Sequence, residues 1–298
     1  MTDSIFPGAP DSPASKPRSD RWLSEGVENR YSQNGEDGVL VRLLEFLPDA
    51  DGWCCEFGAW DGREHSNSRR LIEEHQYQAV LIEGDAERHA DLCRHYQGDS
   101  RIHSLNRFVH WSGENRLDAL LAQTPIPRRF DFLIIDVDGT EYHIWSALQD
   151  YQPKVVCVEF NASIPDFVDY VQPADPLVGQ GNSLEAFVRL AKEKGYELAA
   201  VLPWNAIFID RRYFDRLGIR NNAPSQLRTD RSAITAVFWG YDGSFHMSGR
   251  KSVPWFELPL SRRGFDRVPG FLRQFPFHMS PFKRRVLRLY RKWLRWLV

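Results

Sequence analysis

The sequence predicts an α/β fold with a doubly wound, mostly parallel sheet that ends in an antiparallel hairpin. Short apolar runs of strand length alternate with segments of helical periodicity along most of the chain. The runs are apolar on both faces, which is typical of a parallel sheet covered by helices on each side. The last two runs are separated by little more than Pro203 and Trp204, a spacing that favours a hairpin over a crossover.

The expected elements follow one another in a regular order. The strongest strand signal is 130–137, where Phe132 to Ile135 are consecutive apolar residues. The other expected strands are 52–57, 78–82, 101–105 (a weaker signal), 154–160, 196–202 and 206–210. The expected helices are 32–46 (with Asn34 or Asp37 as its cap), 68–75, 86–96, 117–122, 141–148 and 183–194.

Length and composition predict one large domain with extensions. The chain has 298 residues, of which 42% are hydrophobic and 26% are charged, close to globular averages. A net charge of -2 gives no general attraction to nucleic acid, and we expect no nucleic-acid partner. We expect a disordered leader over 1–20, a folded domain over 21–240 and a C-terminal extension over 241–298.

Cysteine usage and the lack of targeting signals favour a cytoplasmic protein. Cys54, Cys55, Cys93 and Cys157 form no C-x-x-C pair, so buried, reduced thiols are expected. The segment 1–20 is rich in Pro, Ser and Asp and lacks the apolar core of a signal peptide. No apolar stretch approaches the roughly 18 residues needed to span a bilayer.

Glycines and a carboxylate follow the first two strands of the predicted sheet. Ligands of doubly wound sheets bind at the carboxyl ends of the strands. Gly58 and Gly62, just after Glu56, let the backbone pass close to a ligand. Glu83 ends the next strand, where it is suited to accept hydrogen bonds from ribose hydroxyls, or simply to open a helix. The full G-x-G-x-x-G fingerprint is absent, which favours a nucleoside cofactor without a pyrophosphate.

The fourth strand ends in a carboxylate-rich segment that allows three interpretations. Asp136-Val137-Asp138-Gly139-Thr140 resembles the first motif of haloacid-dehalogenase-type phosphatases, which are Mg²⁺-dependent. Glu141 stands where that motif has an apolar residue, and no acidic magnesium-binding pair follows downstream. The metal motif of a glycosyltransferase is the second interpretation, and the donor-side loop of a methyltransferase is the third.

Five segments in order resemble FkbM-type class I methyltransferases, which use S-adenosylmethionine. The resemblance covers about residues 31–210 and departs from the usual signatures at Asp138, where Glu is common, and at Glu56, where Asp is common. Both changes keep the carboxylate. The segments are Tyr31-Ser32-Gln33-Asn34-Gly35-Glu36-Asp37, Glu56-Phe57-Gly58-Ala59-Trp60-Asp61-Gly62, Leu81-Ile82-Glu83, Ile135-Asp136-Val137-Asp138-Gly139-Thr140-Glu141-Tyr142 and Val158-Glu159-Phe160-Asn161.

The resemblance implies a Rossmann-like fold and O-methylation of a sugar, a glycan precursor or another secondary metabolite. It implies that Glu56, Gly58 and Gly62 shape the cofactor pocket. Glu83 would hold the ribose, Gln33 would reach the methionine end, and Asp136 would face the reacting centre. The acceptor itself is not specified, although 162–182 and 211–273 are expected to shape its site.

Methyl transfer to a hydroxyl requires removal of one proton, and the residues offer two routes. His143 is a candidate base, since histidine is the usual general base near neutral pH. Alternatively, Mg²⁺ would lower the hydroxyl pKa, held by oxygen ligands at two strand ends: Asp136, Asp138, Glu159 and Asn161. Three structural alternatives remain open: His143 is a packed core histidine, Asp138 and Glu141 cap a helix, and Asn161 only ends a strand.

The last residues predict a basic amphipathic helix over 281–298. No Asp or Glu follows Asp266, while Lys and Arg recur to the end. Apolar residues from Phe282 to Leu297 follow helical spacing and end in tryptophans. This pattern is typical of a peripheral contact with the inner face of a membrane, or of a helix docked on the domain or on another subunit.

Two further functional alternatives remain beside the enzyme. In the first, the chain is a methyltransferase fold that has lost its activity and acts as a membrane-attached binding module. The carboxylates and glycines retained at the strand ends disfavour such a loss of activity. A magnesium-dependent phosphatase would use Asp136 and Asp138. Binding of RNA through the tail is disfavoured because the D/N-P-P-Y/F type of motif is missing.

Overall fold

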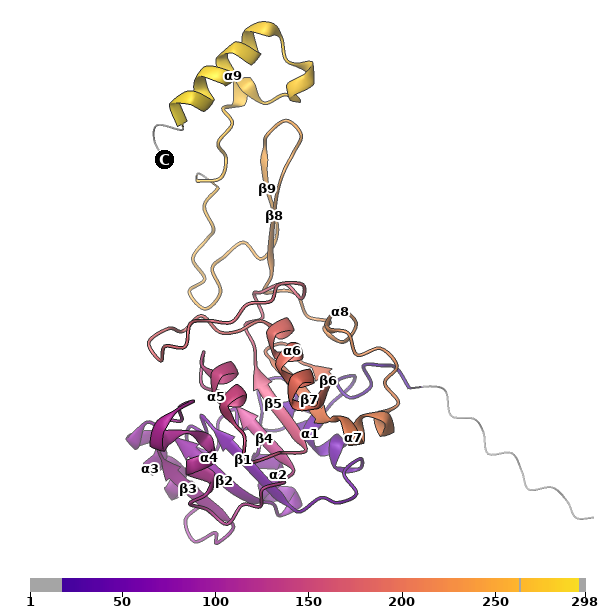
Figure 1. Cartoon of the computed structure of the whole chain (residues 1–298), viewed down its shortest axis with the longest axis vertical. Coiled ribbons are helices and arrows are strands. Elements are labelled where there is room, and N and C mark those ends of the chain that lie inside the picture. Colours follow the sequence, from indigo (N-terminus) through magenta and orange to yellow (C-terminus); the bar gives the residue numbers. More distant parts are fainter. Residues whose placement is uncertain (1–17, 263, 295–298) are drawn as a thin grey trace, which may run out of the picture.

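The protein consists of an α/β domain and an extension that projects from it (Figure 1). The fold is described from a computed structural model, which covers residues 18–262 and 264–294. Seven strands form the central sheet in the order β3-β2-β1-β4-β5-β7-β6. All neighbouring pairs are parallel except those that involve β7, which runs antiparallel to β5 and β6. The predicted doubly wound sheet with a terminal antiparallel hairpin is confirmed.

The strands occupy the predicted apolar runs to within a few residues. Strands β1, β4 and most of β5 are buried, which agrees with the apolar residues on both of their faces. The edge strand β3 is only half buried, which agrees with the weaker apolar pattern of its sequence. The strands are β1 Trp53–Phe57, β2 Gln78–Glu83, β3 Ile102–Asn106, β4 Phe132–Ile135, β5 Val155–Glu159, β6 Tyr196–Val201 and β7 Asn205–Asp210.

Helices cover both faces of the sheet. One core cluster lies beneath α4, α5 and α6 and includes Phe57 and Trp145. A second cluster lies beneath α1, α2 and α3 on the other face and includes Leu40 and Leu92. The helices of the domain are α1 Glu36–Leu44, α2 Arg69–His75, α3 Ala86–His95, α4 Leu117–Leu121, α5 Glu141–Ala147, α6 Leu184–Lys194, α7 Arg211–Phe214 and α8 Pro224–Leu227.

The first helix begins later than the sequence predicts. Helix α1 starts at Glu36, and its N-cap is Gly35 with φ 94°, without a capping side chain. The Asp37 carboxylate instead accepts hydrogen bonds from the Tyr31 amide (2.9 Å) and the Ser32 hydroxyl (2.9 Å). The predicted first turn is therefore a loop, because Asp37 ties its backbone back onto the helix start.

The cysteines are free thiols, as expected, but they do not share one environment. Cys54, Cys55 and Cys157 are buried in the sheet, whereas Cys93 is exposed on α3. Burial raises the pKa of the Cys54 and Cys157 thiols well above the usual value. These two thiols are therefore packing groups of the sheet and not reactive nucleophiles.

The extension contains a two-stranded hairpin and a terminal helix. Strands β8 Thr235–Trp239 and β9 Phe245–Gly249 pair in antiparallel fashion, and α9 spans Pro281–Leu294. Because this hairpin straddles residue 240, we propose that the extension begins before Thr235 and not at 241. Most of the predicted leader (1–17) and the last four residues of the predicted helix lie outside the described residues. In the described part of the chain, no helix is both long and apolar enough to span a bilayer.

Candidate functional site

The exit of β1 requires glycine because it passes directly over the exit of β4. Gly58 has φ 76°, a conformation that disfavours a side chain. A Cβ atom on Gly58 would lie 1.6 Å from the backbone oxygen of Asp136. Gly62 has φ 70°, and a Cβ there would lie 2.8 Å from the Tyr96 ring. Gly58 therefore lets the first and fourth strand ends approach each other, and Gly62 lets the loop after β1 pack against Tyr96.

Replacing Gly58 by Ala is expected to lower the free energy of unfolding by at least about 2 kcal/mol, from backbone strain together with the clash against Asp136. The matched control is Gly98→Ala, since Gly98 has φ 83° and nothing within 4 Å of a new Cβ. That control measures the strain alone, about 1 kcal/mol. Urea unfolding of both variants measures the difference. Equal losses of the free energy of unfolding in the two variants would show that the clash with Asp136 does not contribute.

Glu56 is a positioning residue for the loop that follows β1. Its buried carboxylate accepts hydrogen bonds from the Ser66 hydroxyl (2.8 Å), the Asn67 amide (2.9 Å) and the Ser68 hydroxyl. Burial raises the pKa of Glu56, and these hydrogen bonds oppose the rise because they favour the charged form. Glu56 thus acts on the pocket by fixing the loop through 66–68.

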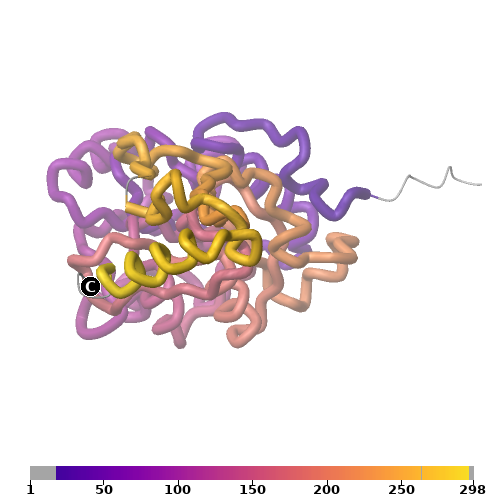
Figure 2. Tube along the Cα trace, turned by 90° about the horizontal axis from the view of Figure 1, so that it is seen from above, coloured from indigo at the N-terminus to yellow at the C-terminus, as the bar shows by residue number. Residues whose placement is uncertain are grey.

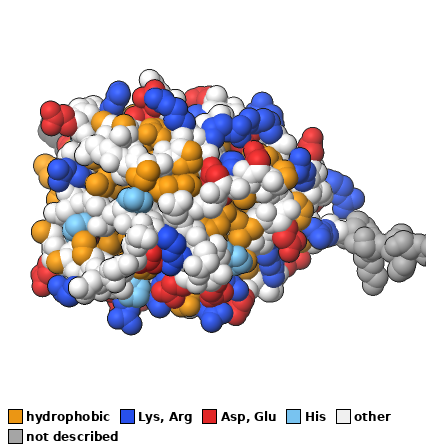
Figure 3. All heavy atoms as spheres, turned by 90° about the horizontal axis from the view of Figure 1, so that it is seen from below, with side chains coloured by type: hydrophobic (Ala, Val, Ile, Leu, Met, Phe, Trp, Pro, Cys, Tyr) orange, Lys and Arg blue, Asp and Glu red, His pale blue; other side chains and the backbone are white. Residues whose placement is uncertain are grey.

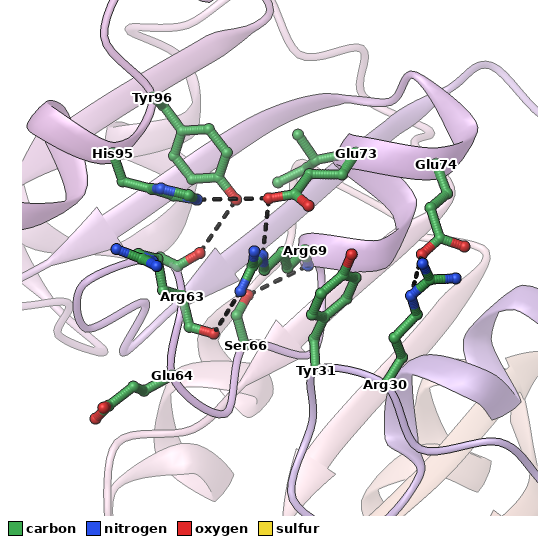
Figure 4. A network of polar contacts seen from close by, with 12 residues as sticks. Arg30, Tyr31, Arg63, Glu64, Ser66, Arg69, Glu73, Glu74, His95 and Tyr96 are labelled. Carbon is green, nitrogen blue, oxygen red and sulfur yellow. Dashed lines mark hydrogen bonds and ion pairs between the residues drawn. The ribbon is translucent and has the colours of Figure 1, made fainter.

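A polar network holds the same loop against two helices (Figure 4). Tyr96, which follows α3, donates its hydroxyl to the Gly62 carbonyl (3.2 Å). Arg69 of α2 pairs with Glu73 (2.8 Å), and its guanidinium lies 4.2 Å from the centroid of the Tyr31 ring. These non-covalent contacts therefore hold together the segment before α1, the loop after β1, and the helices α2 and α3.

Glu83 lies at the end of β2 with its carboxylate facing the exit of β1. One oxygen accepts a hydrogen bond from the Trp60 amide (2.8 Å), and the other accepts from the Asp85 amide (2.8 Å). Each carboxylate oxygen keeps a second lone pair. The carboxylate is therefore held in place by two backbone donors and retains acceptor capacity for a ligand.

These strand ends surround a cavity of about 670 Å³, called here the glycine-loop cavity. Gly58, Glu83 and Asp136 line it. Its remaining wall includes Arg107 to His110, which follow β3 and which the sequence analysis missed. The Phe108 ring lies against Gly84, where a Cβ would come within 2.3 Å of it, yet 74% of Phe108 is exposed. An aromatic residue directly after the third strand is the signal that could have identified this wall.

A second cavity of about 450 Å³, called here the extension cavity, lies beside the first. Glu159 and Asn161 from the end of β5 line one side. Val253 to Phe256 from the extension line the other side. Asp138 and Gly179 line both cavities, so the two cavities adjoin there.

Asp136 and Glu159 are two carboxyl groups that line the two adjoining cavities, one in each. Asp136 lines the glycine-loop cavity and Glu159 lines the extension cavity. Asp136 directly follows β4, and Glu159 ends the neighbouring parallel strand β5. Burial, followed by the charges of Asp138 and Glu141, raises the pKa of Asp136 to about 7. Burial, followed by the charge of Asp136, raises the pKa of Glu159 to about 9. At neutral pH the pair therefore shares a proton.

Glu141 fixes the loop between these carboxylates. Its Oε1 accepts hydrogen bonds from the Gly139 amide (2.7 Å) and the Val137 amide (3.2 Å). Asn182 donates to the Gly139 carbonyl (2.8 Å). Asp138 is held with φ 58° at the exposed turn of this loop. The alternative that Asp138 and Glu141 cap α5 is wrong, because the N-cap position of this helix has no capping side chain and Glu141 instead binds the loop that precedes the helix.

His143 does not line either cavity. Its Nε2 lies 2.8 Å from the Gln172 carbonyl and therefore donates to it, and its ring lies 5.5 Å from that of Trp111. This arrangement resembles the packed histidine considered as an alternative, and a role as the base stays a prediction.

The proposed magnesium ligands are not arranged as a metal site. Among residues 18–262 and 264–294, no group of three or more His, Cys, Asp or Glu side chains could hold a metal ion. The Asn161 amide is already engaged: its Nδ2 donates to Gln180 O (2.8 Å), and its Oδ1 accepts from Ser163 N (2.9 Å). The geometry gives no support to a magnesium ion at Asp136, Asp138, Glu159 and Asn161.

Gln33 is exposed, whereas its neighbour Asn34 is half-buried, and neither residue lines the two cavities. The Asn34 Nδ2 and the Asn205 Oδ1 are buried and have no protein partner. Both residues contact the Glu36 carboxylate, through Asn34 N (2.8 Å) and Asn205 Nδ2 (3.2 Å). Asn205 pairs with Glu159 across β5 and β7. An unsatisfied donor and an unsatisfied acceptor therefore belong to two residues that share Glu36 as a partner, one of which is the strand neighbour of Glu159.

Part of the chain matches a known family. The sequence model described as "Methyltransferase FkbM domain" matches residues 113–198, which confirms the predicted resemblance over that segment. This match supports a methyltransferase that uses S-adenosylmethionine. A search of curated proteins finds no significant match.

Solved structures of methyltransferases are among the similar folds. The N-terminal domain of EvdMO1 with SAH bound is 9% identical, with a TM-score of 0.40, and the match covers 62% of this chain and 82% of that one. The CurJ carbon methyltransferase is 15% identical, with a TM-score of 0.40 and coverages of 60% and 55%. A SAM-dependent methyltransferase from Aquifex aeolicus is 12% identical, with a TM-score of 0.34 and coverages of 57% and 87%.

Proposed function

We propose that this chain is an O-methyltransferase that uses S-adenosylmethionine. In this proposal the donor occupies the glycine-loop cavity, and a hydroxyl of a sugar, a glycan precursor or another secondary metabolite enters the extension cavity. One observation carries the proposal: Asp136 and Glu159, at the ends of two neighbouring strands, line the two adjoining cavities, one residue in each. Methyl transfer to a hydroxyl requires a group that accepts the hydroxyl proton near the reacting atoms, and a carboxylate where the two cavities adjoin can do this.

The residues of the glycine-loop cavity fit a nucleoside with an amino-acid tail. Glu83 keeps lone pairs for two ribose hydroxyls. The exposed Phe108 ring offers a face on which an adenine would stack. Outside the cavity lining, the unpartnered Asn34 Nδ2 can donate to the carboxylate of the methionine end, and the unpartnered Asn205 Oδ1 can accept from its ammonium group. Asn34 thus takes the role predicted for Gln33.

The chain would hold the reacting atoms and accept the proton. S-adenosylmethionine supplies a methyl group on a sulfonium, whose sulfur keeps the electron pair of the broken carbon–sulfur bond. As the carbon–oxygen bond forms, the Asp136 carboxylate takes the hydroxyl proton. Protonated Glu159 donates a hydrogen bond to Asp136 and orients it. The burial that raises the pKa of Asp136 to about 7 makes it a suitable base near neutral pH.

The extension cavity combines aromatic and polar walls in the way that sugar hydroxyls require. Trp255 packs near Trp204, with ring centroids 5.8 Å apart, and Phe256 lies beside it. Such rings offer apolar faces to the C–H groups of a sugar ring. Glu159 on the opposite wall offers a polar group for its hydroxyls. This chemistry favours a hydroxylated acceptor over a purely apolar one.

The affinity for the donor is expected to depend on pH, whereas the affinity for the demethylated product is not. S-adenosylmethionine carries a sulfonium charge, which an ionised Asp136 attracts, and S-adenosylhomocysteine lacks that charge. Because the pKa of Asp136 is about 7, the affinity for S-adenosylmethionine should rise about tenfold from pH 6 to pH 8. Calorimetry with both ligands at each pH measures the ratio. The Asp136→Asn variant should lose the pH dependence, and its persistence there would assign the titration to another group.

The proposal is tested first by calorimetric titration of the whole chain with S-adenosylhomocysteine, with and without Mg²⁺. We expect one site of micromolar affinity that does not change with Mg²⁺. Lack of binding in both conditions would contradict the methyltransferase and favour the phosphatase or the binding module, and hydrolysis of p-nitrophenyl phosphate would separate those two. An increase of affinity with Mg²⁺ would reinstate the predicted metal site.

A further inference from the structure

Helix α9 (Pro281–Leu294) presents an apolar stripe whose large side chains are mostly exposed. Phe282, Val286, Leu289 and Trp293 recur at intervals of three, four and seven residues, so they lie on one face of the helix. Phe282 is 74% exposed, Leu289 is 60% exposed and Trp293 is 59% exposed. Exposed large apolar side chains in a row mark a contact surface.

Residues beside the apolar stripe hold α9 in the extension. The Tyr290 hydroxyl donates to the Arg267 carbonyl (2.9 Å), and Arg284 donates to the Met279 carbonyl (3.0 Å). The Lys283 ammonium donates to Gln274 (3.3 Å). Because these contacts fix the orientation of the helix, its apolar stripe points away from the segment that precedes it.

The helix is also strongly basic and has no acidic neighbours in its own segment. Lys and Arg occupy 283, 284, 285, 288, 291 and 292, and no Asp or Glu follows Asp266 in the sequence. None of these six side chains forms an ion pair within 18–262 and 264–294. The opposite face of the domain differs, because acidic and basic side chains are intermixed there (Figure 3). The positive charge is therefore concentrated beside the apolar stripe.

We propose that α9 docks the protein on the surface of an anionic phospholipid bilayer. An amphipathic helix of this kind lies in the plane of the interface, with its apolar residues among the acyl chains and its basic residues at the phosphates. A second copy of the chain fits this face poorly, because pairing two such helices would bring their basic residues together. Lipid phosphates satisfy both the charge and the apolar stripe.

The position of the extension determines which side of the domain would face the bilayer. The extension rises from the side of the domain where the strands end, and α9 lies above that side (Figures 1 and 2). The extension cavity lies on the same side, since Val253 to Phe256 form one of its walls. Docking through α9 therefore turns this side of the domain toward the bilayer. The docking itself does not depend on methyl transfer.

The test is flotation of the full chain with vesicles of phosphatidylcholine alone and of phosphatidylcholine with 30% phosphatidylglycerol (about one anionic lipid in three). We expect binding to the anionic vesicles only. Each basic residue near an anionic surface strengthens binding about fivefold, so neutralising three should weaken it about 100-fold. The variants are R285Q/R288Q/K292Q for charge and F282S/L289S/W293S for the apolar stripe, and both should lose binding.

Matched controls test whether binding depends on α9 itself or on any surface charge or any exposed aromatic ring of the protein. R94Q/R128Q/R220Q removes the same charge from exposed sites on the domain, and Phe167→Ser removes an exposed ring that is 86% accessible. Both should bind vesicles as the original chain does. S-adenosylhomocysteine affinity, measured for every variant, reports that the domain is folded and tests the proposed function separately.

Two results would overturn the proposal. The first is that the full chain fails to bind the anionic vesicles, or that the controls lose as much binding as the α9 variants. The second is a dimer in sedimentation equilibrium that F282S/L289S/W293S dissociates while vesicle binding is absent. That second result would assign the stripe to a contact between two copies of this chain.

Discussion

The Asp136→Asn variant is expected to transfer methyl groups between 100-fold and 10,000-fold more slowly than the original chain. Asn keeps the size of the side chain but cannot take a proton, and general bases contribute rate factors of this order. The measurement is the rate at which label moves from methyl-labelled S-adenosylmethionine into a glycan and polar-lipid extract. S-adenosylhomocysteine affinity should change less than about threefold, because the product carries no charge for Asp136 to attract.

The control for this variant is His143→Gln. Since His143 donates to the Gln172 carbonyl and does not line either cavity, we expect a smaller loss of rate, within about tenfold. A larger loss in His143→Gln than in Asp136→Asn would assign the proton transfer to the histidine. An unchanged rate in Asp136→Asn would remove Asp136 from the reaction.

The second large effect is expected in Glu83→Ala, which should weaken S-adenosylhomocysteine binding at least about 100-fold. The carboxylate accepts hydrogen bonds from the Trp60 and Asp85 amides, so its loss removes ribose contacts and also frees the loop after β1. A hydrogen bond to a charged group contributes about 1.5–3 kcal/mol, so two ribose contacts account for at least this factor. Calorimetric titration measures the change.

Glu87→Ala is the matched control, because Glu87 is exposed in the first turn of α3 and does not line the glycine-loop cavity. Its affinity for S-adenosylhomocysteine should equal that of the original chain. Urea unfolding of both variants separates a loss of affinity from a loss of folding. Equal affinities of Glu83→Ala and Glu87→Ala for S-adenosylhomocysteine would show that Glu83 does not bind the ribose and only holds the loop backbone.

The sequence predicted the sheet well because burial leaves a clear pattern. Strands β1, β4 and β5 are covered on both faces, so their apolar runs are continuous and easy to recognise. The prediction that Asp136 and Glu159 lie at neighbouring strand ends is confirmed by the parallel pairing of Ile135 with Val158. Their shared proton could not be predicted, since it depends on burial that only the packed structure defines.

The parts that sequence analysis missed lie where burial leaves no pattern. Val237, Phe238 and Trp239 of β8 are exposed, so no alternation distinguishes this strand from a loop. The contact of Trp255 and Phe256 with the same cavity as Glu159 links residues almost 100 positions apart, and no local periodicity encodes it. Asn34 was overlooked in favour of Gln33 because only the structure shows which neighbouring amide is buried and unsatisfied.

The assignment of the donor to the glycine-loop cavity is the central claim, and one comparison tests it directly. S-adenosylhomocysteine is titrated into Phe108→Ala, which alters the glycine-loop cavity, and into Trp255→Ala, which alters the extension cavity. We expect Phe108→Ala to weaken binding about tenfold through loss of adenine stacking, and Trp255→Ala to leave it unchanged within about twofold. Weaker binding in Trp255→Ala together with unchanged binding in Phe108→Ala would contradict the assignment of the donor to the glycine-loop cavity.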